Sequence, residues 1–312
     1  MTAVELLAGI DGGGTRTTLV LAGADGAELA RRVGPAGLVD PRHPAATADM
    51  LAALVRDALA AAGVEGRPAA LCAGLAGVGN ESERVEVERA LAAAGVAERV
   101  RVTTDGAVAL EGALGGEAGV LLVAGTGSVA YARAPDGRVE RCGGWGMLVG
   151  DEGSGWSIGR AGLAAALRSA DGRGPPTTLL PSLLEVLKLD GPPGIPPWAG
   201  RAKKAELAAL ARHVVAAAEE GDAVALQVVE REARELACHA VALARRLEPW
   251  PGPIPIVFHG GALSTPFYAE VVSGALEEFE HAFAPRPSAA DAVHGAISYA
   301  RRLAQEADPV AS

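Results

Sequence analysis

The sequence predicts an α/β protein with two domains that repeat one order of secondary-structure elements. Short runs of β-branched and aliphatic residues alternate with stretches of helical periodicity, which indicates mixed α/β structure. The 312 residues suffice for two ordinary domains with separate cores. The opening pattern of strands and turns also starts again after Gly115 and Gly116. We therefore expect two duplicated βββαβαβα domains, over residues 1–115 and 116–312.

The first domain opens with three strands. In "GIDGGGTRTTLVL" two strands flank a run of glycines, and "ADGAELARRV" adds a turn at Asp25 and Gly26 and then a third strand. Apolar periodicity then predicts alternating helices and strands. In chain order these are a helix over 46–64, a strand over 69–77, a helix over 81–96, a strand over 99–106 and a helix over 107–114.

The second domain repeats the three-strand opening within residues 119–143, where a Gly-Thr-Gly-Ser turn and a turn at Asp136 and Gly137 separate the strands. A proline-rich stretch over 175–197 predicts a surface connection between helices. The final helix, within 288–306, can pack back on the first domain. The other predicted elements are helices over 155–170, 205–222, 223–247 and 265–283 and a buried strand over 253–263.

The composition excludes several classes of function. A formal net charge of −10 leaves no basic surface for nucleic acid. Cys72, Cys142 and Cys238 lie far apart without a C-x-x-C pair, which argues against a zinc site and against a secreted disulfide framework. The N-terminus lacks the pattern of a signal peptide, and the apolar runs are too short to span a bilayer. We expect a cytoplasmic protein without a membrane partner.

The glycine-rich hairpin is the first candidate site. A Walker loop or dinucleotide fingerprint would have a helix after its glycines, whereas a strand follows here. The turn presents the amides of residues 12–15 in one concavity that suits a phosphate. Asp11 ends the strand beside it, where a carboxylate can hold a hydrated divalent cation. An ordinary glycine-rich hairpin with an incidental Asp is the alternative.

Four glycine-marked strand ends share this character. They are residues 11–15, 105–106, 125–128 and 260–261. Two hairpin turns, one from each half, can close on a polyphosphate, and a glycine pair at a later strand-to-helix junction lets a flat base lie against the backbone. Asp105 is expected to face the cleft between the halves.

These motifs resemble those of the sugar kinase, Hsp70 and actin superfamily of two-lobed ATPases with an actin-like (RNase H-like) fold. "DGGGT" is similar to its first phosphate motif, "LLVAGTGS" to its second and "VFHGGAL" to its adenosine motif, while "TTDGAVAL" and "AVHGAISYA" are similar to its connecting helices. "CGGWGMLVGDEGSGWSIG", residues 142–159, resembles the signature of the N-acetylglucosamine kinases within the BadF/BadG/BcrA/BcrD ATPase family. The resemblance covers motifs through nearly the whole chain.

The resemblance implies a homodimeric kinase that uses ATP and Mg²⁺ to convert N-acetylglucosamine to its 6-phosphate. It implies that Asp105 is the base for the sugar hydroxyl and that Asp11 orients magnesium through water. The implied nucleotide contacts are Gly12, Gly13, Gly14, Thr15, Thr126, Gly127, Ser128, Gly260 and Gly261. The implied sugar contacts are Asp105, Gly144, Trp145, Gly146 and Asp151.

One stretch departs from the family's pattern. Where the amino-sugar kinases carry an Asn after the third strand that touches the substrate, this chain has "GPAGLVDPRHP", and the aligned position is Gly37 or its neighbour. Asp40 or Arg42 can supply a different contact there. The physiological sugar is therefore left open.

Each candidate residue also has an ordinary structural explanation. Asp105 can be the N-cap of the following helix, Asp151 can belong to a solvated turn, and Trp145 can be a core residue. Two other functions are also compatible with the motifs. One is a glucosamine or N-acetylmuramate kinase, and the other is an ATPase activator of a 2-hydroxyacyl-CoA dehydratase.

Overall fold

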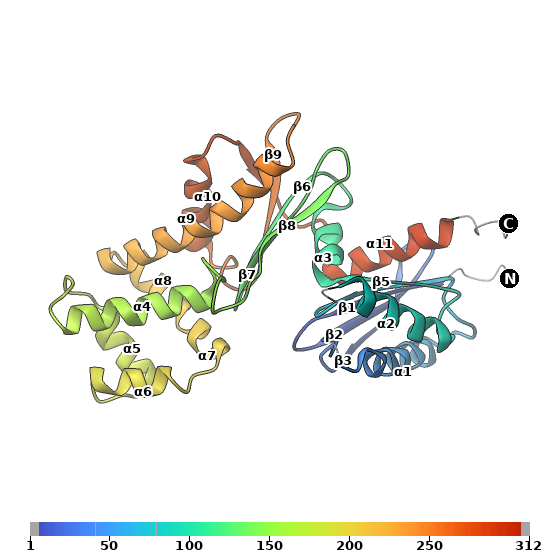
Figure 1. The fold of residues 1–312 in the computed structure, drawn as a ribbon, viewed down its shortest axis with the longest axis horizontal. Helices are drawn as coiled ribbons and strands as arrows, with labels where there is room; N and C mark the ends of the chain where they lie inside the picture. Colours follow the sequence, from blue (N-terminus) through green and yellow to red (C-terminus); the bar gives the residue numbers. More distant parts are fainter. Residues whose placement is uncertain (1–5, 41, 79, 307–312) are drawn as a thin grey trace. The chain divides into compact units, whose positions relative to one another are not determined.

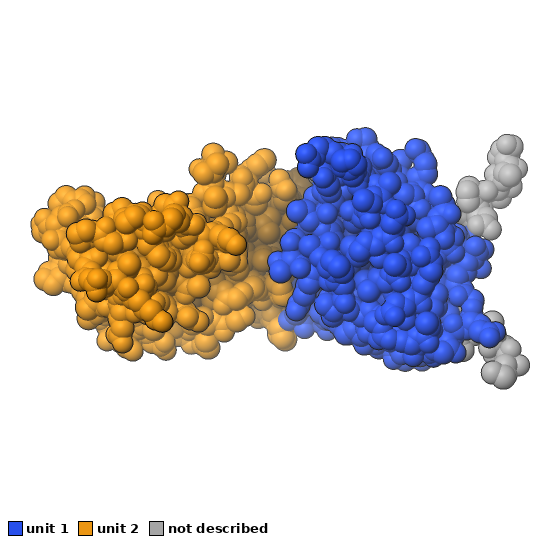
Figure 2. Space-filling view, turned by 90° about the horizontal axis from the view of Figure 1, so that it is seen from below, with its two compact units in different colours: residues 1–117, 288–312 blue, residues 118–287 orange. Residues whose placement is uncertain are grey.

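The computed structural model describes residues 6–40, 42–78 and 80–306 and divides the chain into two units. Unit 1 comprises residues 1–117 together with 288–312, and unit 2 comprises residues 118–287 (Figure 2). Unit 1 is therefore built from both ends of the chain. In the described part, no helix is long and apolar enough to cross a membrane.

Unit 1 contains a five-stranded mixed sheet in the order β3-β2-β1-β4-β5. β1 pairs antiparallel with β2, which pairs antiparallel with β3, while β4 and β5 extend the sheet in parallel from β1. The strands are β1 (Leu6–Gly12), β2 (Thr17–Gly23), β3 (Glu28–Gly34), β4 (Ala70–Leu75) and β5 (Arg99–Thr104). The helices of this unit are α1 (Pro44–Ala62), α2 (Glu81–Ala93), α3 (Asp105–Leu114) and α11 (Ala292–Gln305).

The alternation of side chains along β1 gives this sheet two buried faces. Leu6, Ala8 and Ile10 point into a core shared with α1 and α2. Leu7 lies in a second core with residues of α3 and α11. In Figure 1, α3 and α11 lie on the other side of this sheet from α1. The carboxyl ends of β1 and β5, where Asp11 and Asp105 lie, are thus held by packing on both sides of the sheet.

Close contact between α3 and α11 joins the last helix to unit 1. A Cβ at Gly295 would lie 2.0 Å from the Val108 carbonyl oxygen, and one at Gly112 would lie 2.2 Å from that of Asp291. Since neither position has room for a side chain, the backbones of the two helices approach directly. This contact fixes the N-terminal end of α11 against α3.

Unit 2 repeats the topology of unit 1. Its sheet has the order β10-β9-β6-β7-β8, with β6, β7 and β8 antiparallel and β9 and β10 parallel to β6. The strands are β6 (Gly119–Ala124), β7 (Ser128–Arg133), β8 (Val139–Gly143), β9 (Ile254–His259) and β10 (Phe283–Pro285). The α/β fold class and the duplicated order predicted from the sequence are confirmed.

Unit 2 differs from unit 1 by a long helical insertion between β8 and β9. One large core joins the sheet to buried faces of α4, α8, α9 and α10. The helices are α4 (Gly155–Ala170), α5 (Leu179–Leu187), α6 (Ile195–Ala199), α7 (Lys204–Ala209), α8 (Ala211–Glu219), α9 (Ala223–Arg246) and α10 (Pro266–Glu277), with a short 3₁₀ turn, η1 (Pro192–Gly194).

Three elements differ from the prediction. The helix expected over 205–222 is divided at Leu210, whose amide donates to the Leu207 carbonyl three residues back and so tightens the turn. The helix expected over 265–283 ends at Glu277, because Phe283 pairs with Ile254 as the edge strand β10. The proline-rich stretch contains α5, with Leu179 and Leu183 buried, because tertiary packing overrides the local signal.

Candidate active site

The glycines between β1 and β2 form a hairpin turn, as the sequence predicts. Asp11 pairs with Thr18 across the hairpin, and the Gly13 amide donates to the Arg16 carbonyl (3.0 Å). The Gly13 amide is therefore used inside the turn, which corrects the expectation that it faces a phosphate. The exposed amides of Gly14 and Thr15 donate to none of the described residues and are open to a ligand.

Gly37 packs directly on this turn. Its amide donates to the Gly13 carbonyl (3.0 Å). A Cβ at Gly37 would lie 2.7 Å from both the Gly12 Cα and the Thr17 Oγ1, so no side chain fits. The Asn of the amino-sugar kinases therefore has no equivalent at this position without a backbone shift. Asp40 and Arg42, the suggested substitutes, bond to each other, with the Arg42 amide donating to Asp40 Oδ1 (2.9 Å).

Asp105 is the first residue of α3 and is half-buried. The N-cap is Thr104, whose Oγ1 accepts a hydrogen bond from the Ala107 amide (3.1 Å), so the explanation of Asp105 as the N-cap is wrong. Asp105 Oδ1 accepts from the Gly106 amide (2.8 Å). The first turn of α3 therefore fixes the position of this carboxylate at the strand end.

Asp11 lies in a cluster of like charge. Burial and the neighbouring carboxylates of Asp105 and Asp291 raise the pKa of Asp11 from 3.8 to about 6, while Arg16 acts in the opposite direction. Asp291 is the N-cap of α11 and accepts from the His294 amide (3.0 Å). A carboxylate whose pKa is raised in this way is stabilised in its charged form by a nearby cation. A hydrated Mg²⁺ is suitable because it needs only one or two carboxylates.

In unit 2 the turn over residues 125–128 is held by Asp151. The Ser128 amide donates to Asp151 Oδ1 (3.1 Å), and Ser128 Oγ donates to the Glu152 carbonyl (2.6 Å). Lys204 Nζ, at the start of α7, lies 2.6 Å from Asp151 Oδ2. Asp151 is buried and has the left-handed φ of 63°. The solvated-turn explanation is therefore wrong, and the carboxylate already has partners within its own unit.

The loop between β8 and α4 exposes an apolar surface. Trp145 is 68% exposed, which makes the alternative of a core residue wrong, and Leu148 and Val149 are more exposed still. The Arg141 guanidinium lies 5.2 Å from the centre of the Trp145 ring. The Gly144 amide donates to the Ser128 carbonyl (3.1 Å), which ties the start of this loop to the second hairpin.

A pocket of about 430 Å³ in unit 2 brings several predicted nucleotide contacts together. Gly125 and Thr126 line it together with Gly261 and Ala262. Gly260 has φ +99°, and its Cβ would lie 2.5 Å from the Ala124 carbonyl oxygen, so this junction requires glycine. The rest of the lining is Gly155, Ile158, Ala205, Ala208, Ala209, Ala211, Arg212, Val215 and Thr265.

The pocket's chemistry suits a flat apolar base with a charged tail. Alanines of α7 and α8 form an apolar wall, while Thr126 and Arg212 supply polar groups.

Residues 8–300 match the sequence profile of the BadF/BadG/BcrA/BcrD ATPase family. The chain belongs to this family. Membership in this ATPase family implies the use of ATP, and the pocket is of suitable size for its nucleoside.

Two curated relatives of the family member are sugar kinases. The N-acetylmuramic acid/N-acetylglucosamine kinase of Clostridium acetobutylicum is 30% identical over 264 residues, 84% of this chain and 86% of that protein. The N-acetyl-D-glucosamine kinase of Dictyostelium discoideum is 31% identical over 209 residues, 62% of this chain and 64% of that protein.

A solved structure is similar over almost its whole length. It is a protein of Chromobacterium violaceum proposed to be an N-acetylglucosamine kinase, 30% identical, with a TM-score of 0.72 over 95% of this chain and 99% of that one.

The sequence did not predict two residues of the candidate active site. Lys204 contacts Asp151 from 53 residues further along the chain. Its only sequence signal is rarity, since the chain has three lysines. Asp291 acts on Asp11 from α11, and its N-cap position was the available signal. In the described part of the chain, no group of three or more His, Cys, Asp or Glu side chains can hold a metal ion by itself.

Proposed function

We propose that the chain catalyses the ATP-dependent phosphorylation of an amino sugar. The favoured candidate substrate is N-acetylglucosamine, and the product is its 6-phosphate. The observation that carries the proposal is the carboxylate pair of Asp11 and Asp105. They lie at the carboxyl ends of β1 and β5, which are separated by β4 in the sheet, and a turn with open amides follows β1. Support also comes from the family and from the activity for which the Clostridium relative is named.

In this proposal the residues of unit 1 act at the transferred phosphate and the attacking hydroxyl. Asp105 accepts the proton of the sugar hydroxyl as it attacks phosphorus, which is the task of an aspartate in other phosphoryl transfers. The amides of Gly14 and Thr15 in the β1–β2 turn donate hydrogen bonds to phosphate oxygens. Asp11 would hold a hydrated Mg²⁺ through water, and the bound ion would supply positive charge against the phosphates.

Residues of unit 2 bind the nucleotide and the sugar. Thr126 and Gly127 are proposed to contact the phosphates. Ser128, whose amide and hydroxyl already donate to Asp151 and Glu152, supports this second turn instead. Gly260 and Gly261 are proposed to contact the adenosine. The sugar is proposed to contact the loop of Gly144, Trp145 and Gly146, where an exposed indole can stack on a pyranose and its N–H can donate. Asp151 holds the second turn and is proposed to accept from a sugar hydroxyl as well.

A specific observation favours a second substrate. The Clostridium relative is named for N-acetylmuramic acid as well as for N-acetylglucosamine. The substrate-contacting Asn of the amino-sugar kinases aligns with Gly37 or its neighbour, and there is no room for a side chain at Gly37. Selection against a 3-lactyl ether or a free 2-amino group would need such contacts. N-acetylmuramate and glucosamine are therefore proposed as alternative substrates.

A coupled assay of ADP release against a panel of sugars tests the proposal. The panel contains glucose, glucosamine, N-acetylglucosamine and N-acetylmuramate, and product mass identifies the phosphorylated position. We expect turnover with the acetamido sugars and little with glucose. Release of ADP at the same rate without any sugar would instead favour an ATPase such as a dehydratase activator.

We further propose that the protein is a cytoplasmic homodimer. Sedimentation velocity of the purified protein measures the number of subunits.

A further inference from the structure

A second pocket of unit 2, about 570 Å³ in volume, lies between α4 and α9. None of the residues proposed above to bind sugar or nucleotide lines it. Four arginines do, namely Arg160, Arg168, Arg173 and Arg231. In a chain whose formal net charge is −10, this gathering of cations is unusual and needs an explanation.

The sequence of the two helices creates the hollow. Ser157, Ala161, Ala164 and Ala165 lie on one stripe of α4, at the spacing of successive helical turns. Val224, Gln227 and Val228 form the facing stripe on α9. Because the residues of the α4 stripe are small, the facing stripes leave a gap that longer side chains would fill.

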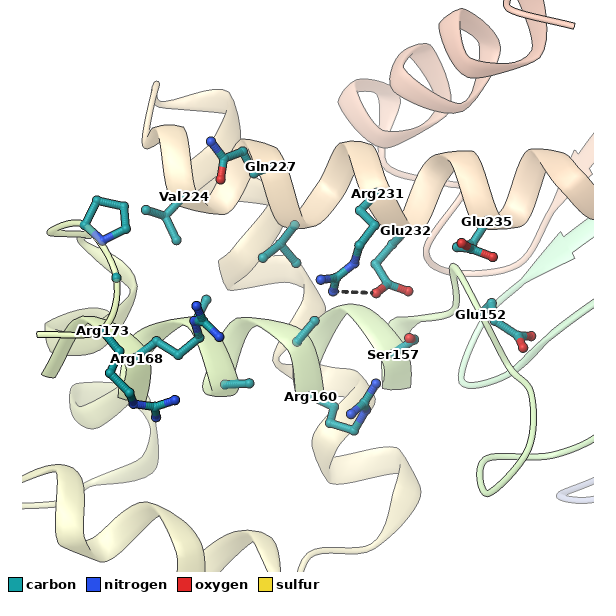
Figure 3. A pocket seen from close by; sticks show the side chains of 16 residues that line it. Glu152, Ser157, Arg160, Arg168, Arg173, Val224, Gln227, Arg231, Glu232 and Glu235 are labelled. Carbon is teal, nitrogen blue, oxygen red and sulfur yellow. Dashed lines mark hydrogen bonds and ion pairs between the residues drawn. The ribbon is translucent and has the colours of Figure 1, made fainter. Parts of the chain in front are cut away.

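The arginines of one end are available to a ligand. Figure 3 shows Arg168 and Arg173 together at one end of the pocket. The Arg173 amide donates to the Arg168 carbonyl (2.9 Å), so the turn after α4 holds the two residues side by side. Within the described residues, the Arg168 guanidinium has no hydrogen-bond or ion-pair partner. Arg173 pairs with Asp171 in an exposed contact of 2.6 Å, which a ligand can displace at little cost.

The opposite end of the pocket is acidic. Glu152 and Glu235 lie there, with the ion pair of Arg231 and Glu232 (3.0 Å) between the two ends (Figure 3). Glu232 is buried and also accepts from the Gly153 amide (3.1 Å). The pocket is therefore cationic at one end and anionic at the other, and Glu232 links it to the loop that carries Asp151.

We propose that this pocket binds a small phosphate monoester whose other end carries an ammonium group or hydroxyls, as an amino-sugar phosphate does. Guanidinium forks match a phosphate in bidentate geometry, and carboxylates accept from ammonium and hydroxyl groups. The volume is in the range of small-molecule sites. Because Glu232 holds Gly153, the bound ester acts as an effector of sugar binding. The binding is independent of the proposed function, whereas the effector role rests on it.

Titration calorimetry tests the binding. The probes are a hexosamine 6-phosphate with a free 2-amino group, its N-acetylated form and inorganic phosphate, each with ADP and unphosphorylated sugar already saturating. Arg168→Gln/Arg173→Gln should bind the aminated probe at least about tenfold more weakly than the parent. Arg234→Gln is the matched control, because Arg234 is on α9 but pairs with Glu278 (2.8 Å) outside the pocket, and it should bind like the parent.

Three outcomes decide the binding proposal. Weaker binding confined to the double variant, with the amine probe tightest in the parent, supports it. Equal binding by parent and double variant overturns the pocket as the site. Equal binding of all three probes to the parent overturns recognition by the acidic end, since the pocket would then recognise only the phosphate.

The effector role is measured as the KM for sugar with and without the aminated probe. We expect the probe to change the KM of the parent by about fivefold or more and to leave that of Arg168→Gln/Arg173→Gln unchanged. Without probe, the double variant should turn over like the parent. An unchanged KM in the parent overturns the effector role. A parent without kinase activity would refute the proposed function instead and leave the calorimetry unaffected.

Discussion

At the scale of single residues, position gives two aspartates of unit 1 different properties. Asp105 lies at a helix N-terminus, where the Gly106 amide donates to its carboxylate. Asp11 is partly buried near other carboxylates, which disfavours ionisation and raises its pKa to about 6. The first arrangement fixes the direction of a carboxylate that serves as a base, and the second suits a carboxylate whose charge is stabilised by a bound cation.

Replacement of Asp105 by Asn should stop the proton transfer without unfolding the protein. Asp105→Asn keeps the size of the side chain but cannot accept the hydroxyl proton, so we expect the turnover rate to fall by about 10²-fold or more. The melting temperature should stay near that of the parent, because Thr104 supplies the cap. Steady-state assays and calorimetric melting measure the two effects.

Thr104→Ala is the matched control for Asp105→Asn. It removes the cap that accepts from the Ala107 amide but keeps the carboxylate. We expect a loss of about 1 kcal/mol of stability with activity largely retained. Normal turnover by Asp105→Asn would show that Asp105 is not the base.

The raised pKa of Asp11 gives a pH-dependent stability. Its folded-state pKa of about 6 exceeds the ordinary 3.8, so the folded protein binds this proton more tightly than the unfolded chain does. The stabilisation of the folded state by this bound proton is present at low pH and is lost as the pH rises from about 4 to about 6. Asp11→Asn should therefore be more stable than the parent at pH 7.5, by about 1–3 kcal/mol, and this advantage should shrink at pH 5.

Urea unfolding at both pH values measures this difference in the free energy of unfolding. Asp49→Asn, on the exposed side of α1, is the control and should show no such trend. A gain for Asp11→Asn that is equal at pH 5 and 7.5 would contradict the raised pKa. Since Asp11 is also proposed to orient magnesium, the variant should lose activity while it gains stability.

Asp151 and Lys204 test whether a buried carboxylate also binds sugar. Asp151→Asn keeps the acceptor for the Ser128 amide and tolerates the left-handed backbone, but it weakens hydrogen bonds from a sugar hydroxyl. We expect its sugar affinity to fall about tenfold in calorimetry. Lys204→Gln removes only the ion pair and should bind sugar nearly as well as the parent. Equal losses in the two variants would assign Asp151 a purely supporting role.

At the scale of elements, tight helix contacts decide how unit 1 is assembled. Gly295→Ala would place a methyl group 2.0 Å from the Val108 carbonyl oxygen and must separate α11 from α3. We expect a loss of about 1–3 kcal/mol or more. Gly274→Ala in α10 is the control, since a Cβ there meets nothing within 4 Å and should be neutral or stabilising by the helix propensity of Ala. Chemical denaturation of both variants compares the two, and equal stabilities would contradict the close contact.

The sequence predicted those elements whose signals are local. The β1–β2 hairpin, the helices over α1 and α9 and the repeated order all follow from turn residues and periodicity. The break at Leu210, the edge strand at Phe283 and the pairing of Lys204 with Asp151 depend on contacts between distant segments, which no local pattern encodes. The requirement for glycine at position 37 is likewise not local, because it comes from the close approach of the Gly12 backbone.

At the scale of the whole molecule, unit 1 depends on the last part of the chain. α11 packs on the sheet face that contains Cys72, and Arg302 on α11 pairs with the buried Glu111 (2.7 Å). Burial raises the pKa of the Cys72 thiol to about 12, so this thiol is unreactive in the folded protein. A chain that ends at Pro287 lacks α11, while unit 2 retains all of its residues.

Deletion of residues 288–312 should therefore expose Cys72 while unit 2 stays folded. We expect a maleimide at pH 8 to label Cys72 of the truncated chain about 10²-fold or more faster than that of the parent, because both access and the thiolate fraction increase. Peptide mass spectrometry after timed quenching measures the rate at each cysteine separately. Cys238, exposed on α9, is the internal control and should react equally in both proteins. Continued protection of Cys72 in the truncated chain would mean that residues 6–117 hold this face of the sheet without α11, and the discontinuous assembly of unit 1 would then be dispensable for its core.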